Sequence, residues 1–238
     1  MPNVGPVTKA QLARLARSWK QGQHVLISGS TGSGKTVLAR ELDQIRLDNG
    51  GHVVVFVAKL RPDATLVKDY RHFTRWKKWK RFPTAGDKAI LLYPPVERLD
   101  LKEAKRVQRE VFAEALNKIA KAGNWTIHID EGLYFSSPTF LGLADEIAMM
   151  HQMGRSSGIT MIDLTQRPSH LPLVTYSSAE HAFLGRTREA VDLKRLSELG
   201  GREGAKELAP RIAALGKHDF LWLPVGPDWP AETLNTRD

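Results

Sequence analysis

The sequence predicts an α/β fold with a mostly parallel sheet and helices on both of its faces. Short apolar segments alternate with helical segments along the chain of 238 residues, an order typical of parallel sheets. The run from Val53 to Val57 contains only valine and phenylalanine, without polar alternation, which indicates a strand covered on both faces. Chain length and ordinary composition are those of one large globular domain.

The elements follow from local patterns of apolar residues, glycine and proline. We expect strands at 24–28, 52–58, 89–93, 125–129, 159–164, 181–184 and 219–223. We expect helices at 8–21, from 37 to about 49, 100–123, from 137 onward, 189–199 and 203–215. This order predicts an N-terminal helix within 1–22, a core domain at 23–224 and a C-terminal tail at 225–238.

The composition indicates in which compartment the protein works and what kind of partner it binds. The chain has no cysteine, which fits a reducing compartment and excludes a disulfide framework. No apolar run reaches the roughly 20 residues of a membrane span, and the first residues have no signal-peptide pattern. We therefore expect a cytoplasmic protein, in the host cytoplasm if the gene is viral. The formal net charge of +9 favours a polyanionic partner.

A glycine-rich segment between the first strand and its helix carries the strongest chemical signal. Eight consecutive residues fit the phosphate-loop pattern G-x-x-x-x-G-K-[ST] at every required position. They are Gly29, Ser30, Thr31, Gly32, Ser33, Gly34, Lys35 and Thr36. Glycines let backbone N–H groups converge on phosphate oxygens, and the following helix adds its positive dipole end. We expect this loop to bind ATP, with Lys35 at the β- and γ-phosphates and Thr36 on Mg²⁺.

Two further polar sites follow predicted strands. Asp130 ends an apolar strand, where a carboxylate can hold the Mg²⁺ shell, and Glu131 beside it can polarise a water as general base. A phosphotransferase must exclude water, so this pair favours hydrolysis; an ordinary acid pair at a strand end is the alternative. Gln166, directly after another strand, can sense the γ-phosphate. His128 inside the apolar strand is expected to be a satisfied core histidine.

Together these motifs resemble the motor domain of the FtsK/HerA superfamily of DNA-pumping ATPases. The residues that carry the resemblance are the phosphate loop, the Asp130-Glu131 pair and the run from Gly158 to Ser169, which contains Thr-Gln-Arg-Pro-Ser. The resemblance implies a RecA-like P-loop core of the ASCE type, with the sensor strand between the strands of the other two motifs. It also implies a ring, commonly a hexamer, with ATP bound between subunits.

The resemblance further implies an arginine donated by the neighbouring subunit. Arg155 lies just before the sensor strand, where related motors place theirs, with Arg186 and Arg188 as alternatives. An arginine that caps the end of the preceding helix explains Arg155 equally well. The sequence has none of the extra domains of septal or archaeal relatives, so we expect a bare motor of phage or mobile-element type.

A basic and aromatic stretch is the candidate DNA contact. Residues 71–82 hold six Lys or Arg, four aromatic residues and no acid. The DNA-contact candidates are Lys59, Arg61, Arg75, Lys77, Lys78, Lys80 and Arg81. The rival interpretation is that Trp76, Trp79 and Phe82 bury into the domain from one helical face while the lysines are merely solvated.

The sequence thus favours an ATP-hydrolysing translocase of double-stranded DNA, in DNA packaging or transfer. The first alternative is a P-loop ATPase that powers protein secretion or virion assembly without DNA. A small-molecule phosphotransferase is a third possibility, and Glu131 argues against it.

Overall fold

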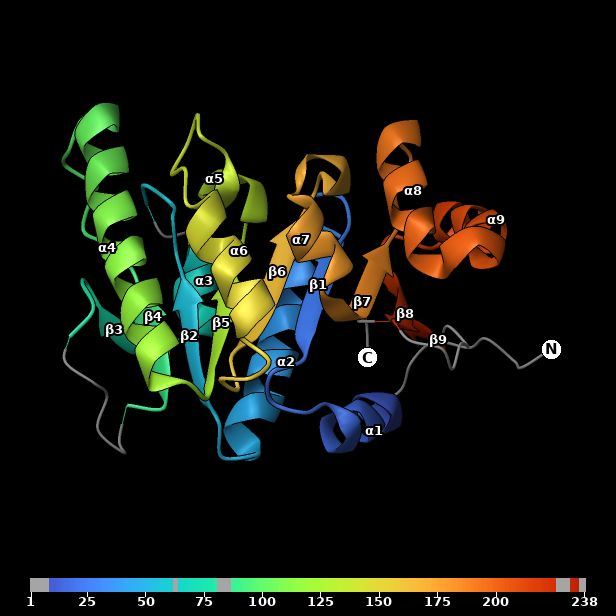
Figure 1. The fold of residues 1–238 in the computed structure, drawn as a ribbon, viewed down its shortest axis with the longest axis horizontal. Helices are drawn as coiled ribbons and strands as arrows, with labels where there is room; N and C mark the ends of the chain where they lie inside the picture. Colours follow the sequence, from blue (N-terminus) through green and yellow to red (C-terminus); the bar gives the residue numbers. More distant parts are fainter. Residues whose placement is uncertain (1–8, 62–63, 81–86, 226–231, 236–238) are drawn as a thin grey trace.

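One sheet organises the molecule. The computed structural model describes residues 9–61, 64–80, 87–225 and 232–235. In these ranges nine strands pair in the order β3-β4-β2-β5-β6-β1-β7-β8-β9 (Figure 1). The strands are β1 (His24–Ser28), β2 (His52–Phe56), β3 (Thr74–Trp76), β4 (Ala89–Leu92), β5 (Trp125–Ile129), β6 (Thr160–Thr165), β7 (Ala179–Gly185), β8 (Asp219–Pro224) and β9 (Glu232–Asn235). β1 to β7 pair in parallel and β8 and β9 are antiparallel, so the predicted mostly parallel sheet is confirmed.

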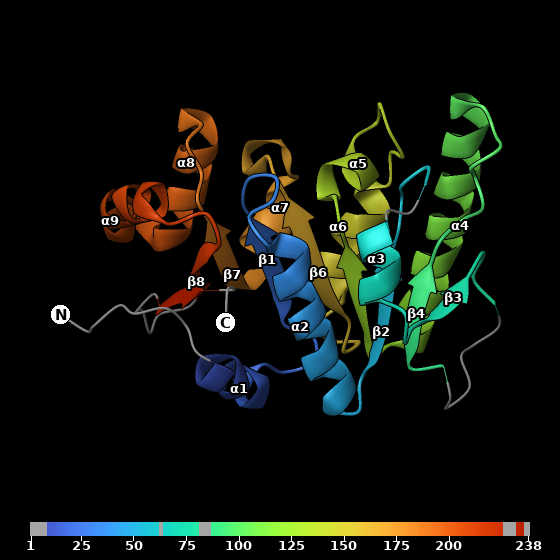
Figure 2. The same cartoon turned by 180° about the vertical axis from the view of Figure 1, so that it is seen from behind.

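Helices cover both faces of the sheet. They are α1 (Lys9–Ser18), α2 (Lys35–Asp48), α3 (Ala64–Asp69), α4 (Leu101–Ala122), α5 (Gly132–Ser136), α6 (Ala144–Met153), α7 (Leu173–Ser177), α8 (Ala190–Ser197) and α9 (Gly201–Ala214). Figure 1 shows α4 to α7 in front of the sheet, and Figure 2 shows α2 and α3 on the other face. Val53 and Val55 of β2 pack in one apolar cluster and Val54 and Phe56 in another, which is why this strand is apolar throughout.

The sensor strand has the position that the resemblance implied. β6 lies between β1 and β5, and both pairings are parallel. Ser28 at the end of β1 is level with Thr165 at the end of β6. The segments that follow β1, β5 and β6 therefore leave the sheet at the same edge.

One predicted helix start was wrong. The helix expected from 137 onward begins instead at Ala144, after the short α5. The Ser137 N–H donates to Leu133 O and closes α5, and the Gly142 N–H donates to Ser137 O in a turn. Gly142 has φ +60°, in the left-handed region that glycine adopts without strain, so the chain turns before α6 can start.

The two terminal segments both contribute to the fold. Leu15 of α1 packs in an apolar cluster with residues of α2 and β1, and Trp19, just after α1, packs in the same cluster. β9 lies within the predicted tail at 225–238 and extends the sheet by pairing with β8. Across the described ranges, none of the helices combines the length and apolar character needed to cross a membrane.

The basic and aromatic stretch is not helical. In its described part, residues 71–80, it forms the edge strand β3, followed by a bend at Lys77 and Lys78. Trp76 and Trp79 are buried, with exposed fractions of 2% and 4%, and their rings meet edge to face at 5.2 Å. Burial of these two tryptophans is confirmed, although the helical spacing proposed for it was wrong. Phe82 and Arg81 lie outside the described residues.

A buried histidine ties β1 to its neighbours. The Met161 N–H donates to His24 Nδ1 at 3.1 Å, so Nε2 carries the proton and donates to His151 O at 3.0 Å. A second proton on His24 would face the Met161 N–H. Burial, and then the nearby charge of His151, lower the pKa of His24 to about 4, while Asp163 opposes this shift and Arg155 adds to it.

We predict that the free energy of unfolding falls as the pH drops from 6.5 toward 4. Over this range the unfolded chain protonates His24 at its ordinary pKa of 6.5, whereas the folded chain keeps the ring neutral. One such group contributes about 1.4 kcal/mol per pH unit. In urea unfolding measured from pH 7 to 4.5, the unfolding free energy of His24→Asn should depend less steeply on pH than that of the parent. The difference should correspond to the uptake of about one proton on unfolding. Equal pH slopes for parent and variant would contradict the assignment.

Candidate active site

The phosphate loop joins β1 to α2 and has the curled backbone that the motif requires. Gly32 and Gly34 have φ +72° and +98°, in the left-handed region that favours glycine. Ser33 N–H donates to Ser30 O, which closes a turn, and α2 begins at Lys35. The N–H groups at the start of α2 are thereby presented to an anion at the loop.

Lys35 lies across this loop. Its ammonium donates to Gly29 O at 2.8 Å and to Ser30 O at 3.0 Å, which leaves one of its three N–H donors for a ligand. Burial lowers the pKa of Lys35, and the carboxylates of Glu131 and Asp130 oppose this shift. The loop thus holds a partly desolvated cation, and the lower local dielectric strengthens the attraction of Lys35 for phosphate.

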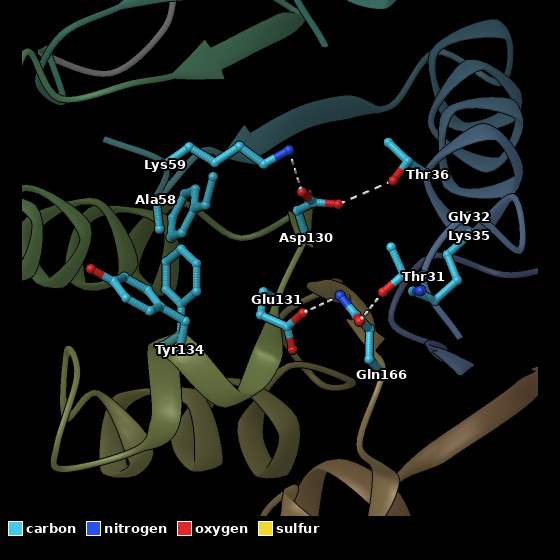
Figure 3. A pocket seen from close by; sticks show the side chains of 12 residues that line it. Thr31, Gly32, Lys35, Thr36, Ala58, Lys59, Asp130, Glu131, Tyr134 and Gln166 are labelled. Atoms are coloured by element: carbon cyan, nitrogen blue, oxygen red, sulfur yellow. Dashed lines mark hydrogen bonds and ion pairs between the residues drawn. The ribbon is translucent and has the colours of Figure 1, made fainter. Parts of the chain in front are cut away.

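Asp130 lies between a hydroxyl and a cation (Figure 3). Thr36 Oγ1 donates to Asp130 Oδ1 at 3.3 Å, and Lys59 Nζ lies 3.4 Å from Asp130 Oδ2. A hydroxyl and a carboxylate are the hard oxygen ligands that Mg²⁺ takes together with water and substrate phosphates. The donor set therefore fits the predicted magnesium site at Thr36 and Asp130.

Glu131 and Gln166 meet at the same edge of the sheet. Gln166 Nε2 donates to Glu131 Oε2 at 3.3 Å, and the Thr31 hydroxyl donates to Gln166 Oε1 at 2.5 Å (Figure 3). Burial raises the pKa of Glu131 and Asp130 adds to the shift, while Lys35 and the Gln166 hydrogen bond oppose it. A carboxylate with a raised pKa is a stronger base, as proton abstraction from water requires.

These groups line one cavity of about 430 Å³. The side of the cavity away from the phosphate loop is formed by Phe56, Ala58, Tyr134 and Phe135. Tyr134 OH donates to Gln108 Oε1 at 3.0 Å, and Gln108 Nε2 donates to Ala58 O at 2.9 Å. This chain of hydrogen bonds connects the cavity wall to α4 and to the segment after β2.

Arg155 lies at the opposite end of the sheet from the phosphate loop. It precedes β6, and its backbone packs against Gly22, just before β1. A methyl group added at Gly22 would lie only 3.0 Å from the Arg155 carbonyl oxygen. A six-residue strand spans about 20 Å, beyond the reach of an arginine side chain. The side chain is exposed and makes no hydrogen bond or ion pair with a described residue. Within one chain Arg155 therefore does not join the other predicted site residues.

The other cations are distributed over three places. Lys59 lies in the cavity beside Asp130, a position that the sequence interpretation missed. Arg186 and Arg188 line a second cavity next to the phosphate loop. The DNA-contact candidates Arg61, Arg75, Lys77, Lys78 and Lys80 are exposed, and Arg81 lies outside the described residues.

Two of these exposed candidates have partners within the chain. Arg75 lies 3.6 Å from Glu97, with its guanidinium over the Tyr93 ring. Lys80 lies over the Trp76 ring. Lys77 and Lys78 are exposed and form no ion pair within 4.0 Å with a described residue, although a backbone hydrogen bond lowers the pKa of Glu97 and the charge of Lys77 adds to this shift.

The position of Lys59 follows from strand order. Lys59 comes shortly after β2, and β2 pairs in parallel with β5, which ends just before Asp130. The signal that could have located Lys59 was a cation shortly after the strand that lies next to β5, the strand that ends before Asp130. Strand order is not written in the local sequence, so the pairing of Lys59 with Asp130 required the fold.

We compared the chain with family models, curated proteins and solved structures, and only solved structures match. No family model matches the chain, and no curated protein matches it. Among solved structures, B204, the DNA-packaging ATPase from Sulfolobus turreted icosahedral virus, matches with a TM-score of 0.64 and 20% identity. This match covers 91% of the present chain and 98% of B204.

Two further structures match more distantly. The bacterial conjugative coupling protein TrwBΔN70 has a TM-score of 0.58 and 13% identity, over 96% of this chain and 91% of that one. The cytoplasmic domain of the Thermomonospora curvata type VII secretion ATPase EccC has a TM-score of 0.58 and 15% identity. That match covers 91% of this chain and 25% of EccC. The chain therefore has the RecA-like P-loop fold of these solved structures.

Proposed function

We propose that this protein is an ATPase that couples hydrolysis to the movement of double-stranded DNA, in viral or mobile-element DNA packaging or transfer. The observation that carries the proposal is the single cavity in which the phosphate loop, Asp130, Glu131 and Gln166 meet. The match to B204, a DNA-packaging ATPase, supports the DNA substrate because it extends over nearly the whole of both chains.

Five polar residues of the cavity have defined parts in this reaction. Lys35 and the loop N–H groups bind the phosphates, and Thr36 with Asp130 would hold Mg²⁺. The ion, when bound, neutralises charge on the phosphates. Glu131 accepts the proton of the attacking water, and Gln166, hydrogen bonded to Glu131, orients the same water.

The proposal includes sharing of sites between subunits. Each chain presents its phosphate loop at one edge of the sheet and the exposed Arg155 at the other. A head-to-tail ring, which we propose to be a hexamer, brings each Arg155 to the loop of a neighbour. The lack of cysteine fits a reducing compartment, and we place the motor in the cytoplasm, of the host cell if the gene is viral.

A protein-directed ATPase is the second candidate, and the match to EccC favours it. The two candidates share the hydrolytic site and differ in the polymer that stimulates turnover. Stimulation of ATP hydrolysis by duplex DNA supports the translocase. Turnover that is indifferent to DNA under every salt condition would favour the protein-directed alternative.

Glu131→Gln should abolish hydrolysis while nucleotide stays bound. The substitution removes the proton acceptor and keeps the size of the side chain, so turnover should fall by about 10²- to 10⁴-fold. The measurement is phosphate release together with binding of a fluorescent ATP analogue. Glu114→Gln on the exposed side of α4 is the matched control. Parental turnover in Glu131→Gln would remove Glu131 from the role of base.

Arg155→Ala should bind ATP normally and hydrolyse it about 10³- to 10⁵-fold more slowly, the range for loss of an arginine finger. Mixing it with Lys35→Ala should restore activity, because about a quarter of head-to-tail interfaces in a random equal mixture regain both groups. Turnover of the mixture is compared with that of each variant alone. If subunit exchange is demonstrated and no activity returns, Arg155 does not act between subunits.

Replacing Lys77 and Lys78 together by alanine should weaken binding to all duplex sequences alike. Affinity falls as salt rises, and each lost phosphate contact makes the slope of log affinity against log salt less steep by about 0.9. Both side chains are exposed at the sheet edge, so folding should not change. Fluorescence anisotropy at several salt concentrations measures the slope, with Lys118→Ala/Lys121→Ala on α4 as the control. An unchanged slope would leave Arg61 as the next DNA-contact candidate.

A further inference from the structure

A second cavity of about 390 Å³ lies beside the phosphate loop, on the side of β7 and β8. The residues that matter in its lining are Ser30, Gln166, Arg186, Arg188, Asp192 and Lys217. Gln166 lines both cavities, and Ser30 belongs to the phosphate loop itself. The second cavity is thus a direct neighbour of the proposed hydrolytic site.

Two connections bring the cations to this place. Arg186 follows the last residue of β7, which pairs in parallel with β1, so it leaves the sheet at the edge of the phosphate loop. Lys217 precedes β8, which runs antiparallel to β7 and therefore starts at the same edge. The Lys217 side chain lies near the phosphate loop, since a methyl group added at Gly32 would be 4.0 Å from its Cε. The next residue, His218, has its Nδ1 3.3 Å from Ser33 O.

The positive charge of this cavity is only partly balanced, because its lining holds three cations, Arg186, Arg188 and Lys217, against two acids, the exposed Glu189 and the paired Asp192. Asp192 is fully occupied, since it accepts from Ser169 N–H at 2.9 Å and pairs with Arg167 Nε at 3.0 Å. No described carboxylate lies within 4.0 Å of the charged groups of Arg186, Arg188 or Lys217. Arg186 Nε is buried and has no hydrogen-bond partner among the described residues. A buried donor without a partner is costly, and an anion in the cavity would remove that cost.

The division of chemistry between the two cavities indicates which anion belongs here. Asp130 and Glu131 line the first cavity only, so the terminal phosphate belongs there. The remainder of the nucleotide must leave the loop in another direction. The aromatic wall of the first cavity is a poor platform for a base, because Phe56 and Phe135 are 0% and 1% exposed and pack within the apolar core. The third aromatic residue of the wall, Tyr134, is half-buried and its ring already stacks on Phe140.

We propose that the second cavity receives the α-phosphate and ribose end of the nucleotide, with Arg186 and Lys217 as ligands of phosphate oxygens supplied by the same chain. This inference rests on the proposed ATPase function. It also reassigns Arg186 and Arg188, the alternatives to Arg155 as the arginine given to a neighbour, because they lie beside their own phosphate loop.

The test measures nucleotide affinity rather than turnover. Isothermal titration calorimetry with the full chain and Mg²⁺ compares ADP with a non-hydrolysable ATP analogue. Lys217→Ala and Arg186→Ala should each weaken both nucleotides by a similar factor, roughly tenfold or more, because both nucleotides carry the α- and β-phosphates. Lys217 is exposed, so its replacement should leave folding unchanged, and Lys217→Arg should retain most of the affinity.

Controls separate this inference from the proposed function. Lys194→Ala, an exposed cation on α8 outside the cavity lining, should bind both nucleotides like the parent, and Lys35→Ala should bind neither well. A parent protein that binds no nucleotide would overturn the proposed function and this inference with it. A parent that binds both, with Lys217→Ala and Arg186→Ala binding equally well, would overturn this inference alone.

Two other outcomes identify a different phosphate. Loss of affinity for the ATP analogue but not for ADP would place the cations at the terminal phosphate and overturn the assignment. Unchanged nucleotide affinity with a reduced salt slope for duplex DNA would place DNA backbone phosphates in the cavity. Each result contradicts the proposal and leaves the hydrolytic site in the first cavity untouched.

Discussion

The parallel register of β1, β6 and β5 is the constraint on which the rest of the site depends. Ser28 is level with Thr165, so the phosphate loop and Gln166 begin at the same height. Ile129 is level with Asp163, so continuation by two residues brings Glu131 level with Thr165, next to Gln166. Neighbouring strands lie about 4.8 Å apart, which places three segments distant in sequence within hydrogen-bonding range.

Buried polar pairs hold this register from both faces of the sheet. On one face, His128 Nδ1 lies 2.8 Å from Asp43 Oδ2, and Tyr70 OH donates to the same oxygen at 2.9 Å. On the other, His151 Nε2 lies 3.0 Å from Asp163 Oδ2. His128 is a core residue, as expected, but only its Nδ1 has partners; its buried Nε2 has none among the described residues, so the expectation of a satisfied histidine was wrong. Its partner Asp43 lies on α2, so the pair ties the phosphate-loop helix to the strand that ends before Asp130.

Lysine and arginine side chains serve different purposes in the two cavities and at the edge of the sheet. Lys59 pairs with Asp130 inside the first cavity, and Lys77 and Lys78 lie in solvent just after an edge strand. Arg186 and Lys217 line a cavity whose cations outnumber its acids. Surface cations act on distant polyanions through a field that salt screens, whereas cations that line a cavity act on one ligand at short range. The net charge of +9 alone does not distinguish these uses.

The sequence by itself determined the fold class, the phosphate loop, the acids after β5 and the glutamine after β6. These depend on contiguous residues: strand runs, glycines with positive φ, and side chains at strand ends. Only the tertiary structure decided the start of α6, the burial of Trp76 and Trp79 without a helix, and the separation of Arg155 from its own loop. It also decided that Lys59 and Lys217 lie beside the phosphate site. Those outcomes depend on strand order and on the direction of β8, which are set by packing across the whole sheet.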